Sequence, residues 1–87
     1  MEIQYHRNFV KQYKRLDVKL QQQFLERQAL WLKKPDDPRL RVHPLKGKFV
    51  GHWSMNVSGD LRAIYYYERE RLVIFALIGT HSQLYGA

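Results

Sequence analysis

The chain contains no cysteine, which excludes disulfide bonds and thiolate metal sites. Apolar runs are short: none approaches the roughly 18 residues of a membrane-spanning helix, and the N-terminus has no apolar stretch of the signal-peptide type. Low-complexity runs and internal repeats are also absent. These absences favour a soluble, cytoplasmic protein that folds without disulfides.

Acidic residues are few, with eight Asp and Glu against fifteen Lys and Arg, so the net charge is +7. A charge of this size on a small domain favours a polyanionic partner: nucleic acid, or an acidic protein that neutralises the surface. The alternative is that the charge serves only solubility. The 87 residues suit a single domain, 1–87, whose modest core is helped by an aromatic content of 14%.

The first part of the sequence predicts a short strand and two helices. Residues 2–5 alternate between polar and apolar side chains, which is typical of a strand. Asn8 is placed to cap a first helix, and Asp17 is placed to cap a second, longer helix that ends at 33–34. The Pro-Asp-Asp-Pro segment at 35–38 then prevents the helix from continuing.

The second predicted helix is apolar over a wide arc made of two stripes. One stripe contains Leu20, Phe24 and Trp31, and the other contains Val18, Leu25, Ala29 and Leu32. Two interpretations are open: the helix packs against both the sheet and the first helix, or it leaves an apolar strip for a partner.

The rest of the sequence changes to a period of two, which predicts strands. A short alternating segment covers 39–43, and the longer predicted strands are 53–57, 61–67 and 72–78. We expect 72–78, the most apolar of them, to be the central strand, and 80–85 to form a short helical turn capped by Thr80. The predicted fold class is α+β, with two N-terminal helices packed on a mainly antiparallel β-sheet, in the order β-α-α-β-β-β with a short C-terminal turn.

Side chains suited to RNA cleavage cluster between residues 43 and 85. The candidate catalytic residues are His43, Asp60, Arg62, His81 and Tyr85. Cleavage without a metal needs a base for the 2′-hydroxyl proton, a cation for the crowded phosphate and an acid for the leaving oxygen. Histidine suits proton transfer near neutral pH, arginine donates two hydrogen bonds to a phosphate, and an aromatic ring stacks on an unpaired base.

Polar residues on one predicted strand face and in the preceding turn complete the candidate site. On the strand 53–57 the apolar residues face the helices, so the polar residues face the other way. The next strand adds Arg62, Ile64 and Tyr66 to that open face. The expected substrate-binding residues are Ser54 and Asn56 on this face and Lys46 and Lys48 in the turn.

The candidate residues also have purely structural interpretations. His43 and His81 can be turn or surface residues, and Asp60 is of a type that commonly forms turns. Arg62 can pair with a neighbouring carboxylate such as that of Asp60. A metal site is disfavoured, because His43, His52 and His81 show no close ligand spacing such as HxxxH. We therefore expect no metal and no cofactor, and we interpret the histidines outside the catalytic set as surface residues.

Several segments resemble the RelE/ParE superfamily of bacterial toxins, with the same order of elements over the whole chain. They are His43-Pro44-Leu45-Lys46-Gly47, Gly51, Gly59-Asp60-Leu61-Arg62-Ala63-Ile64-Tyr65-Tyr66 and Gly79-Thr80-His81-Ser82-Gln83-Leu84-Tyr85. The ending, an apolar strand followed by Gly-Thr-His-Ser-x-Leu-aromatic, is most similar to the YafQ branch.

The resemblance implies a toxin of a type II toxin–antitoxin system: a ribosome-dependent, metal-independent endoribonuclease that cleaves mRNA in the 30S A site. Its implied partner is a small acidic antitoxin encoded beside it. By position, the YafQ-like site residues are His43, Asp60, His81 and Tyr85. Arg62 matches the phosphate-binding arginine of the RelE branch. We expect His81 to be the general acid and His43 or Asp60 to be the base.

Two positions depart from the YafQ pattern. Asn56 stands where the branch usually carries another histidine, and Ser54 stands where it carries an acidic residue. An amide can hydrogen-bond a phosphate but cannot carry a proton near neutral pH. Two outcomes are open: Arg62 compensates in a site of mixed YafQ-like and RelE-like character, or activity is weak.

Two rival functions fit the same fold. A ParE-like toxin would inhibit gyrase, although proteins of that kind generally lack the histidine set present here. A catalytically weakened toxin would chiefly bind its antitoxin, and the replacement at Asn56 is consistent with that alternative.

Overall fold

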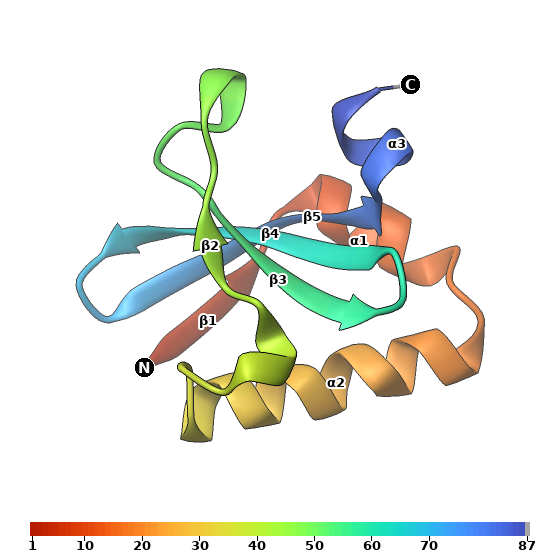
Figure 1. Cartoon of the computed structure of the whole chain (residues 1–87), viewed down its shortest axis with the longest axis horizontal. Helices are drawn as coiled ribbons and strands as arrows, with labels where there is room; N and C mark the ends of the chain where they lie inside the picture. Colours follow the sequence, from red (N-terminus) through yellow and green to blue (C-terminus); the bar gives the residue numbers. More distant parts are fainter. Residues whose placement is uncertain (87) are drawn as a thin grey trace.

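A five-stranded sheet lies at the centre of the fold, and the elements follow the predicted order along the chain, except that β2 makes a fourth strand after the helices (Figure 1). The helices and strands are β1 (Glu2–Tyr5), α1 (Arg7–Lys14), α2 (Val18–Lys33), β2 (His43–Pro44), β3 (Trp53–Ser58), β4 (Leu61–Arg69), β5 (Leu72–Thr80) and α3 (His81–Tyr85). Two short 3-10 turns, η1 (Pro38–Leu40) and η2 (Gly47–Phe49), flank β2. This computed structural model describes residues 1–86, so Ala87, the last residue of the expected domain, lies outside the described residues.

The strands lie in the order β1-β5-β4-β3-β2, with β1 parallel to β5 and the other neighbours antiparallel. This confirms the mainly antiparallel α+β fold. The expectation that 72–78 would be the central strand is wrong, because β5 is internal but β4 is the middle strand. The short strand β2 extends the sheet beyond β3, and this addition moves the centre to β4.

Segment 39–43 does not form the expected alternating strand. Pro38 begins η1, which Asp37 caps by accepting a hydrogen bond from the N–H of Arg39 at 2.9 Å. Arg41 then adopts a left-handed backbone conformation with a φ of 47°. Because a left-handed residue interrupts the pleat of a strand, only His43–Pro44 pairs with β3.

Capping signals in the sequence predicted the starts of α2 and α3 but not the start of α1. Asp17 caps α2 by accepting a backbone N–H at 2.9 Å, and Thr80 begins a reciprocal capping box at α3. The cap of α1 is His6, whose Nδ1 accepts the N–H of Asn8 at 3.0 Å, so the expectation for Asn8 is wrong. Asn8 lies inside the first turn because the chain leaves β1 immediately before His6.

The hydrophobic core lies between the sheet and the two long helices and is rich in aromatic rings. Its aromatic members are Phe9, Phe24, Trp31, Tyr65 and Phe75. Phe24 meets Phe75 edge to face at 5.4 Å, and the Trp31 indole N–H donates to the Tyr65 hydroxyl at 3.1 Å. Burial raises the pKa of Tyr65 to about 12. This packing holds α1 and α2 on one face of the sheet.

The inner stripe of α2 packs against both the sheet and α1, as the first interpretation expects, while its outer stripe is exposed. Val18, Leu25 and Leu32 are 67%, 51% and 50% exposed, whereas Phe24 and Trp31 are buried. The helix therefore leaves an apolar strip, which consists of Val18, Leu25, Ala29 and Leu32. Among residues 1–86, no helix combines the length and the apolar content needed to cross a membrane.

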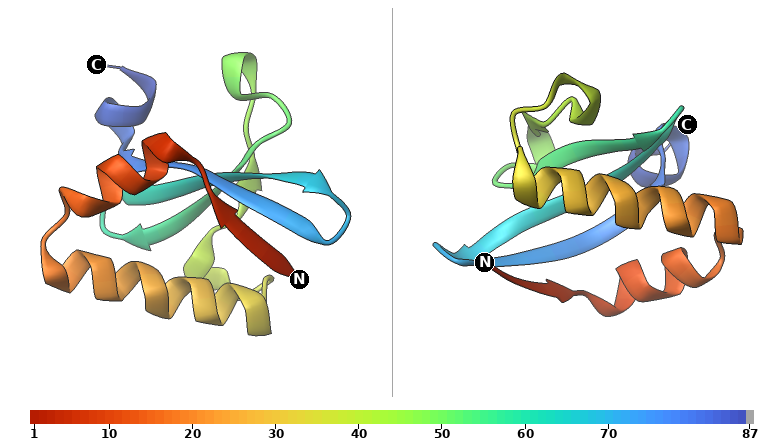
Figure 2. Two further views of the ribbon diagram at one scale, coloured as in Figure 1. Left: turned by 180° about the vertical axis from the view of Figure 1, so that it is seen from behind. Right: turned by 90° about the horizontal axis from the view of Figure 1, so that it is seen from below.

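Two segments rise from the sheet face opposite α2: the loop 45–52, which carries η2, and helix α3 (Figures 1 and 2). They are distant in the sequence but stand on either side of the middle of the sheet in both views. Of the candidate catalytic residues, His43 and Arg62 lie on the sheet and His81 and Tyr85 lie on α3, whereas Asp60 lies in the turn between β3 and β4.

Candidate active site

The predicted catalytic side chains converge on the sheet face opposite α1 and α2, although they come from distant segments. A hollow of about 330 Å³ is lined by His43, Leu45, Lys46, Lys48, Phe49, Arg62, His81 and Tyr85. Asp60 lies beside this hollow and contacts two of its lining residues. Within residues 1–86, no three His, Asp or Glu side chains come together in a way that could hold a metal ion. The residues that line the hollow provide proton carriers, cations and aromatic rings.

His43 is held with one ring nitrogen committed to the protein. Its Nδ1 lies 2.8 Å from the carbonyl oxygen of Arg41. Because a carbonyl can only accept, neutral His43 carries its hydrogen on Nδ1 and presents Nε2 as an acceptor. The left-handed backbone of Arg41 sets the direction of that carbonyl. The turn that ends the expected strand at 39–43 thus defines the tautomer of a candidate catalytic histidine.

Asp60 joins two parts of the site through its carboxylate. One oxygen accepts a hydrogen bond from the Arg62 guanidinium at 2.9 Å, which is the ion pair considered as a structural interpretation of Arg62. The other oxygen accepts the backbone N–H of His81 at 3.2 Å. Both oxygens are therefore engaged, and the start of β4 is tied to the start of α3.

His81 and Tyr85 form one wall of the hollow. Helix α3 begins at His81 because Thr80 and Gln83 form a reciprocal capping box. This start places His81 and Tyr85 on one face of the helix, with ring centroids 4.7 Å apart, and the Tyr85 ring also meets Phe49 at 5.7 Å. The Tyr85 hydroxyl is buried and has no hydrogen-bond partner among residues 1–86.

The family model described as bacterial toxin of type II toxin–antitoxin system, YafQ, matches residues 1–86. The chain belongs to the YafQ toxin family. The match extends over the helices as well as the site and confirms the resemblance seen in the sequence. Comparison with curated proteins gives no sequence match.

Solved structures of other toxins share the fold. YafQ from E. coli strain BL21(DE3) is 24% identical to this chain, with a TM-score of 0.83 and 98% of each chain covered. The match in the E. coli DinJ–YafQ complex is 26% identical, with a TM-score of 0.74 and 98% of each chain covered. A YoeB/ParE toxin from Agrobacterium tumefaciens is 18% identical, with a TM-score of 0.77, and covers 93% of this chain and 99% of that one. These neighbours place the YafQ-family toxin among the folds of the RelE superfamily.

In this YafQ-family toxin, the two departures from the expected pattern have defined structural positions. The Asn56 amide donates to the carbonyl oxygen of Gly59 at 3.0 Å and braces the turn between β3 and β4. Ser54 pairs with His43 across β2 and β3 and is only 2% exposed. Both line a smaller hollow of about 160 Å³, which shares His43 and Arg62 with the larger one. Asn56 is thus half-exposed beside the site, whereas Ser54 lies at its buried base.

The open face of the sheet is less polar and less exposed than expected. Across β3 and β4, Ser54 pairs with Ile64 and Asn56 pairs with Arg62. Ile64 points away from the helices but is fully buried. Part of this face is covered by α3, whose buried Leu84 packs close to β5. The toxin therefore has a small second core on this face, and the site occupies the part that remains open.

Phe49 and His52 were not among the predicted site residues. Phe49 lines the hollow. The sequence could have indicated it, because Phe49 is an aromatic residue in a turn rich in Lys and Gly, where no helix or strand face would bury it. His52, interpreted as a surface residue, is half-buried, and its ring lies 5.0 Å from Tyr66 and 5.9 Å from Phe49. Alternation along 52–56 would have placed His52 on the same face as Asn56.

Positive charge continues beyond the hollow. A shallow depression of about 590 Å³ adjoins the site at Asn56 and is lined by Arg27, Arg39 and Arg41 among others. Arg39 is paired with Asp37 at 2.9 Å, and the Arg39 guanidinium holds the pKa of that carboxyl well below its usual range. Arg27 and Arg41 have no ion-pair partner within residues 1–86. The arrangement suits a polyanion that crosses the site.

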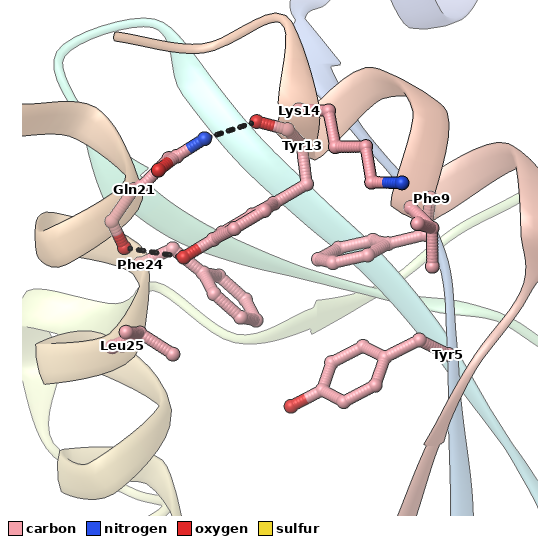
Figure 3. Close-up of a pocket in the computed structure, with 8 residues that line it drawn as sticks. Tyr5, Phe9, Tyr13, Lys14, Gln21, Phe24 and Leu25 are labelled. Carbon is pink, nitrogen blue, oxygen red and sulfur yellow. Dashed lines mark hydrogen bonds between the residues drawn. The ribbon is translucent and has the colours of Figure 1, made fainter. Parts of the chain in front are cut away.

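A different kind of concavity lies between α1 and α2, and Figure 3 shows its lining. This groove measures about 340 Å³ and is lined by Tyr5, Phe9, Val10, Tyr13, Lys14, Gln21, Phe24 and Leu25. Tyr13 and Gln21 join the two helices through hydrogen bonds of 3.2 and 3.0 Å (Figure 3). Lys14 is its only charged lining residue among those described, so the groove is suited to binding apolar side chains and not to catalysis.

Proposed function

We propose that this YafQ-family toxin is a ribosome-dependent mRNA endonuclease whose own side chains carry out the chemistry. The observation that carries the proposal is the convergence of His43, Arg62 and His81 on one hollow that also holds an aromatic wall. Metal-free cleavage of RNA requires a base, a cation and an acid, and these three side chains are of the right types.

His43 is the proposed general base. Its Nε2 accepts the proton of the ribose 2′-hydroxyl, because Nδ1 is committed to the Arg41 carbonyl. The 2′-oxygen then forms a bond to the adjacent phosphorus, and the bond from phosphorus to the 5′-oxygen breaks. The products are a 2′,3′-cyclic phosphate and a 5′-hydroxyl, so no water is consumed in this step.

Arg62 and His81 are proposed to act on the phosphate and on the leaving 5′-oxygen, respectively. The Arg62 guanidinium stabilises the additional negative charge on the phosphate oxygens in the transition state. Protonated His81 donates its proton to the departing 5′-oxygen. Asp60 is proposed to position both residues instead of acting as the base, because each of its carboxylate oxygens already accepts a hydrogen bond. Tyr85 is proposed to stack on a base of the codon, which keeps the phosphate in place.

The test is a cleavage assay on ribosomes programmed with a defined mRNA. We expect His81→Asn to lower the rate of cleavage about 100- to 10,000-fold, because proton transfer to the leaving oxygen is lost. The control is His6→Asn, which replaces a histidine far from the site with another good helix cap. Cleavage by His81→Asn at the wild-type rate would rule out His81 as the acid.

The assay also separates the rival functions. A ParE-like gyrase inhibitor would leave ribosome-bound mRNA intact and induce DNA-damage signalling. A weakened toxin, consistent with Asn56, would do neither and would still bind its antitoxin. Binding to ribosomes should weaken steeply as salt rises, because the charge of +7 includes lysines that line the hollow. From the proposed action on ribosomes we infer a cytoplasmic location.

We also propose a small acidic antitoxin as the partner of this toxin. The family consists of toxins of type II toxin–antitoxin systems, and the similar E. coli YafQ has been solved in complex with DinJ. The groove between α1 and α2 and the adjoining apolar strip of α2 suit an amphipathic segment, and the net charge of +7 suits an acidic one.

A charge-matched pair of variants tests the antitoxin surface. Leu25→Glu places a carboxylate in the groove, whereas Gln22→Glu places one on an exposed position of the same helix. We expect Leu25→Glu to weaken antitoxin binding at least tenfold and Gln22→Glu to change it little, because only Leu25 lines the groove. Equal effects of the two substitutions would show that charge alone matters and that the groove is not the docking surface.

A further inference from the structure

Aromatic rings continue from the proposed active site across the open face of the sheet. The Tyr85 ring lies 4.7 Å from His81 and 5.7 Å from Phe49. Phe49 lies 5.9 Å from His52, and His52 lies 5.0 Å from Tyr66. We call His81, Tyr85, Phe49, His52 and Tyr66 the aromatic row. It connects α3, η2 and β4, which are separate in the sequence.

The members of the aromatic row are not core residues. The aromatic residues of the helix-facing core, such as Phe9 and Phe24, are almost fully buried. In contrast, Phe49, His52 and Tyr66 are each partly exposed. They lie on the face of the sheet that also carries Arg62 and not on the face covered by α1 and α2.

The geometry of the row leaves ring surface available to a ligand. The Tyr66–His52, His52–Phe49 and Phe49–Tyr85 pairs meet at interplanar angles of 57°, 71° and 74°, so the rings are not stacked face to face on one another. Lys48 places its ammonium group 5.4 Å from the centre of the Phe49 ring. Aromatic faces beside cations are the usual components of sites for single-stranded nucleic acid.

We propose that Phe49, His52 and Tyr66 form a subsite for an unstacked base of single-stranded RNA, next to the phosphate that is cleaved. This inference rests on the proposed endonuclease function and extends its substrate contacts beyond the hollow. Tyr85 borders both the hollow and Phe49, so a strand that passes the catalytic groups meets the subsite at the next base. Stacking does not depend on a particular base, so the subsite adds affinity with little sequence preference.

Two neighbouring tyrosines of β4 provide a matched test. Tyr66 belongs to the aromatic row, whereas Tyr67, 43% exposed, lies on the helix face beside Tyr65 at 6.0 Å. Tyr66→Leu keeps an apolar side chain but removes the ring. In the ribosome assay we expect Tyr66→Leu to raise KM about tenfold with little change in kcat, and Tyr67→Leu to change neither. Equal KM values for Tyr66→Leu and wild type would overturn the subsite.

A second measurement detects stacking directly and needs no cleavage. The probe is a short single-stranded RNA that carries 2′-O-methyl groups, which block the reaction, and a fluorescent 2-aminopurine base. Wild type and Tyr66→Phe should quench the fluorescence, and Tyr66→Leu and His52→Leu should quench it much less. Thermal unfolding of each variant checks that it is folded. If Tyr66→Leu does not fold, His52→Leu tests the subsite independently.

The two measurements fail in different ways. If wild type does not quench the probe, or if the leucine variants quench it fully, the subsite is wrong whether or not the toxin cleaves mRNA. If wild type quenches the probe through Tyr66 but leaves ribosome-bound mRNA intact, the base-binding subsite stands and the endonuclease proposal fails.

Discussion

The backbone N–H of His81 donates to the Asp60 carboxylate at 3.2 Å, across 21 positions of sequence. This bond brings the start of α3 to the start of β4, where the same carboxylate also holds the Arg62 guanidinium at 2.9 Å. The proposed acid and the proposed phosphate ligand are therefore positioned by one side chain. We therefore expect Asp60 to affect cleavage by positioning Arg62 and His81.

Asp60→Asn tests this positioning role. The amide can keep one acceptor oxygen but loses the ion pair with Arg62, so we expect kcat to fall on the order of 100-fold because the site becomes misaligned. The acidic limb of the kcat–pH profile should persist, because His43 remains as the base. Disappearance of that limb in Asp60→Asn, measured on ribosomes from pH 5 to pH 9, would assign the base to Asp60 instead.

Placing at position 56 the histidine that the resemblance led us to expect should change the rate of cleavage and the stability in opposite directions. Asn56→His places a proton carrier beside Arg62 and His43, so we expect faster cleavage. It also removes the 3.0 Å hydrogen bond to the Gly59 carbonyl, which should lower the free energy of unfolding by about 1 kcal/mol. Asn56→Ala is the control, with a similar loss of stability and no gain in rate. A rate for Asn56→His at or below that of Asn56→Ala would show that Arg62 already compensates.

Gly79 lies at a close approach between β5 and the start of α3. A Cβ atom at this position would lie 3.0 Å from the Gln83 side-chain oxygen and 3.3 Å from Leu84. Gly79→Ala should therefore break the capping box and destabilise the toxin by about 1 kcal/mol. The rate of cleavage should also fall while the protein is still folded, because α3 carries His81. Ser82→Ala, at an exposed position of α3, is the control for both urea unfolding and cleavage.

Asp37 should make the stability of the toxin depend on acid. Hydrogen bonds from Arg39 lower the pKa of Asp37 in the folded state, so the ionised carboxylate favours folding. That contribution is fully present above the unfolded-state pKa of about 3.9 and is lost as pH falls through the lower folded-state pKa. The stability difference between wild type and Asp37→Asn, measured by urea unfolding, should be constant from pH 7 to pH 5 and shrink toward pH 2.

Asp36→Asn, at the exposed neighbouring position, is the control for Asp37. If the difference between wild type and Asp37→Asn were the same at pH 2 as at pH 7, the Arg39 contact would not be responsible. Asn can still cap η1 through its side-chain oxygen, so Asp37→Asn tests the ion pair with Arg39 and not the loss of the cap.

Local patterns were sufficient for most of the fold. Apolar spacing predicted the two helices, alternation predicted β3, β4 and β5, and capping types predicted the starts of α2 and α3. These features depend on neighbours two to four residues away, so they can be recognised along the chain. The prediction of a strand at 39–43 was wrong because it relied on local alternation alone. The alternation is present, but Pro38 and the left-handed Arg41 redirect the backbone.

The composition and order of residues were enough to predict a basic α+β domain with histidine, arginine and aspartate at strand ends and turns, and the resemblance of its motifs to a family indicated a toxin. The working arrangement came only from the packed molecule, because it depends on contacts between segments that the sequence does not relate. Folding gives Asp60 two partners, turns the Arg41 carbonyl to His43, and assembles Phe49, His52 and Tyr66 into one row. The motif ending in His81 and Tyr85 indicated the family, and the tertiary structure placed it beside His43 and Arg62, with which we propose that it acts.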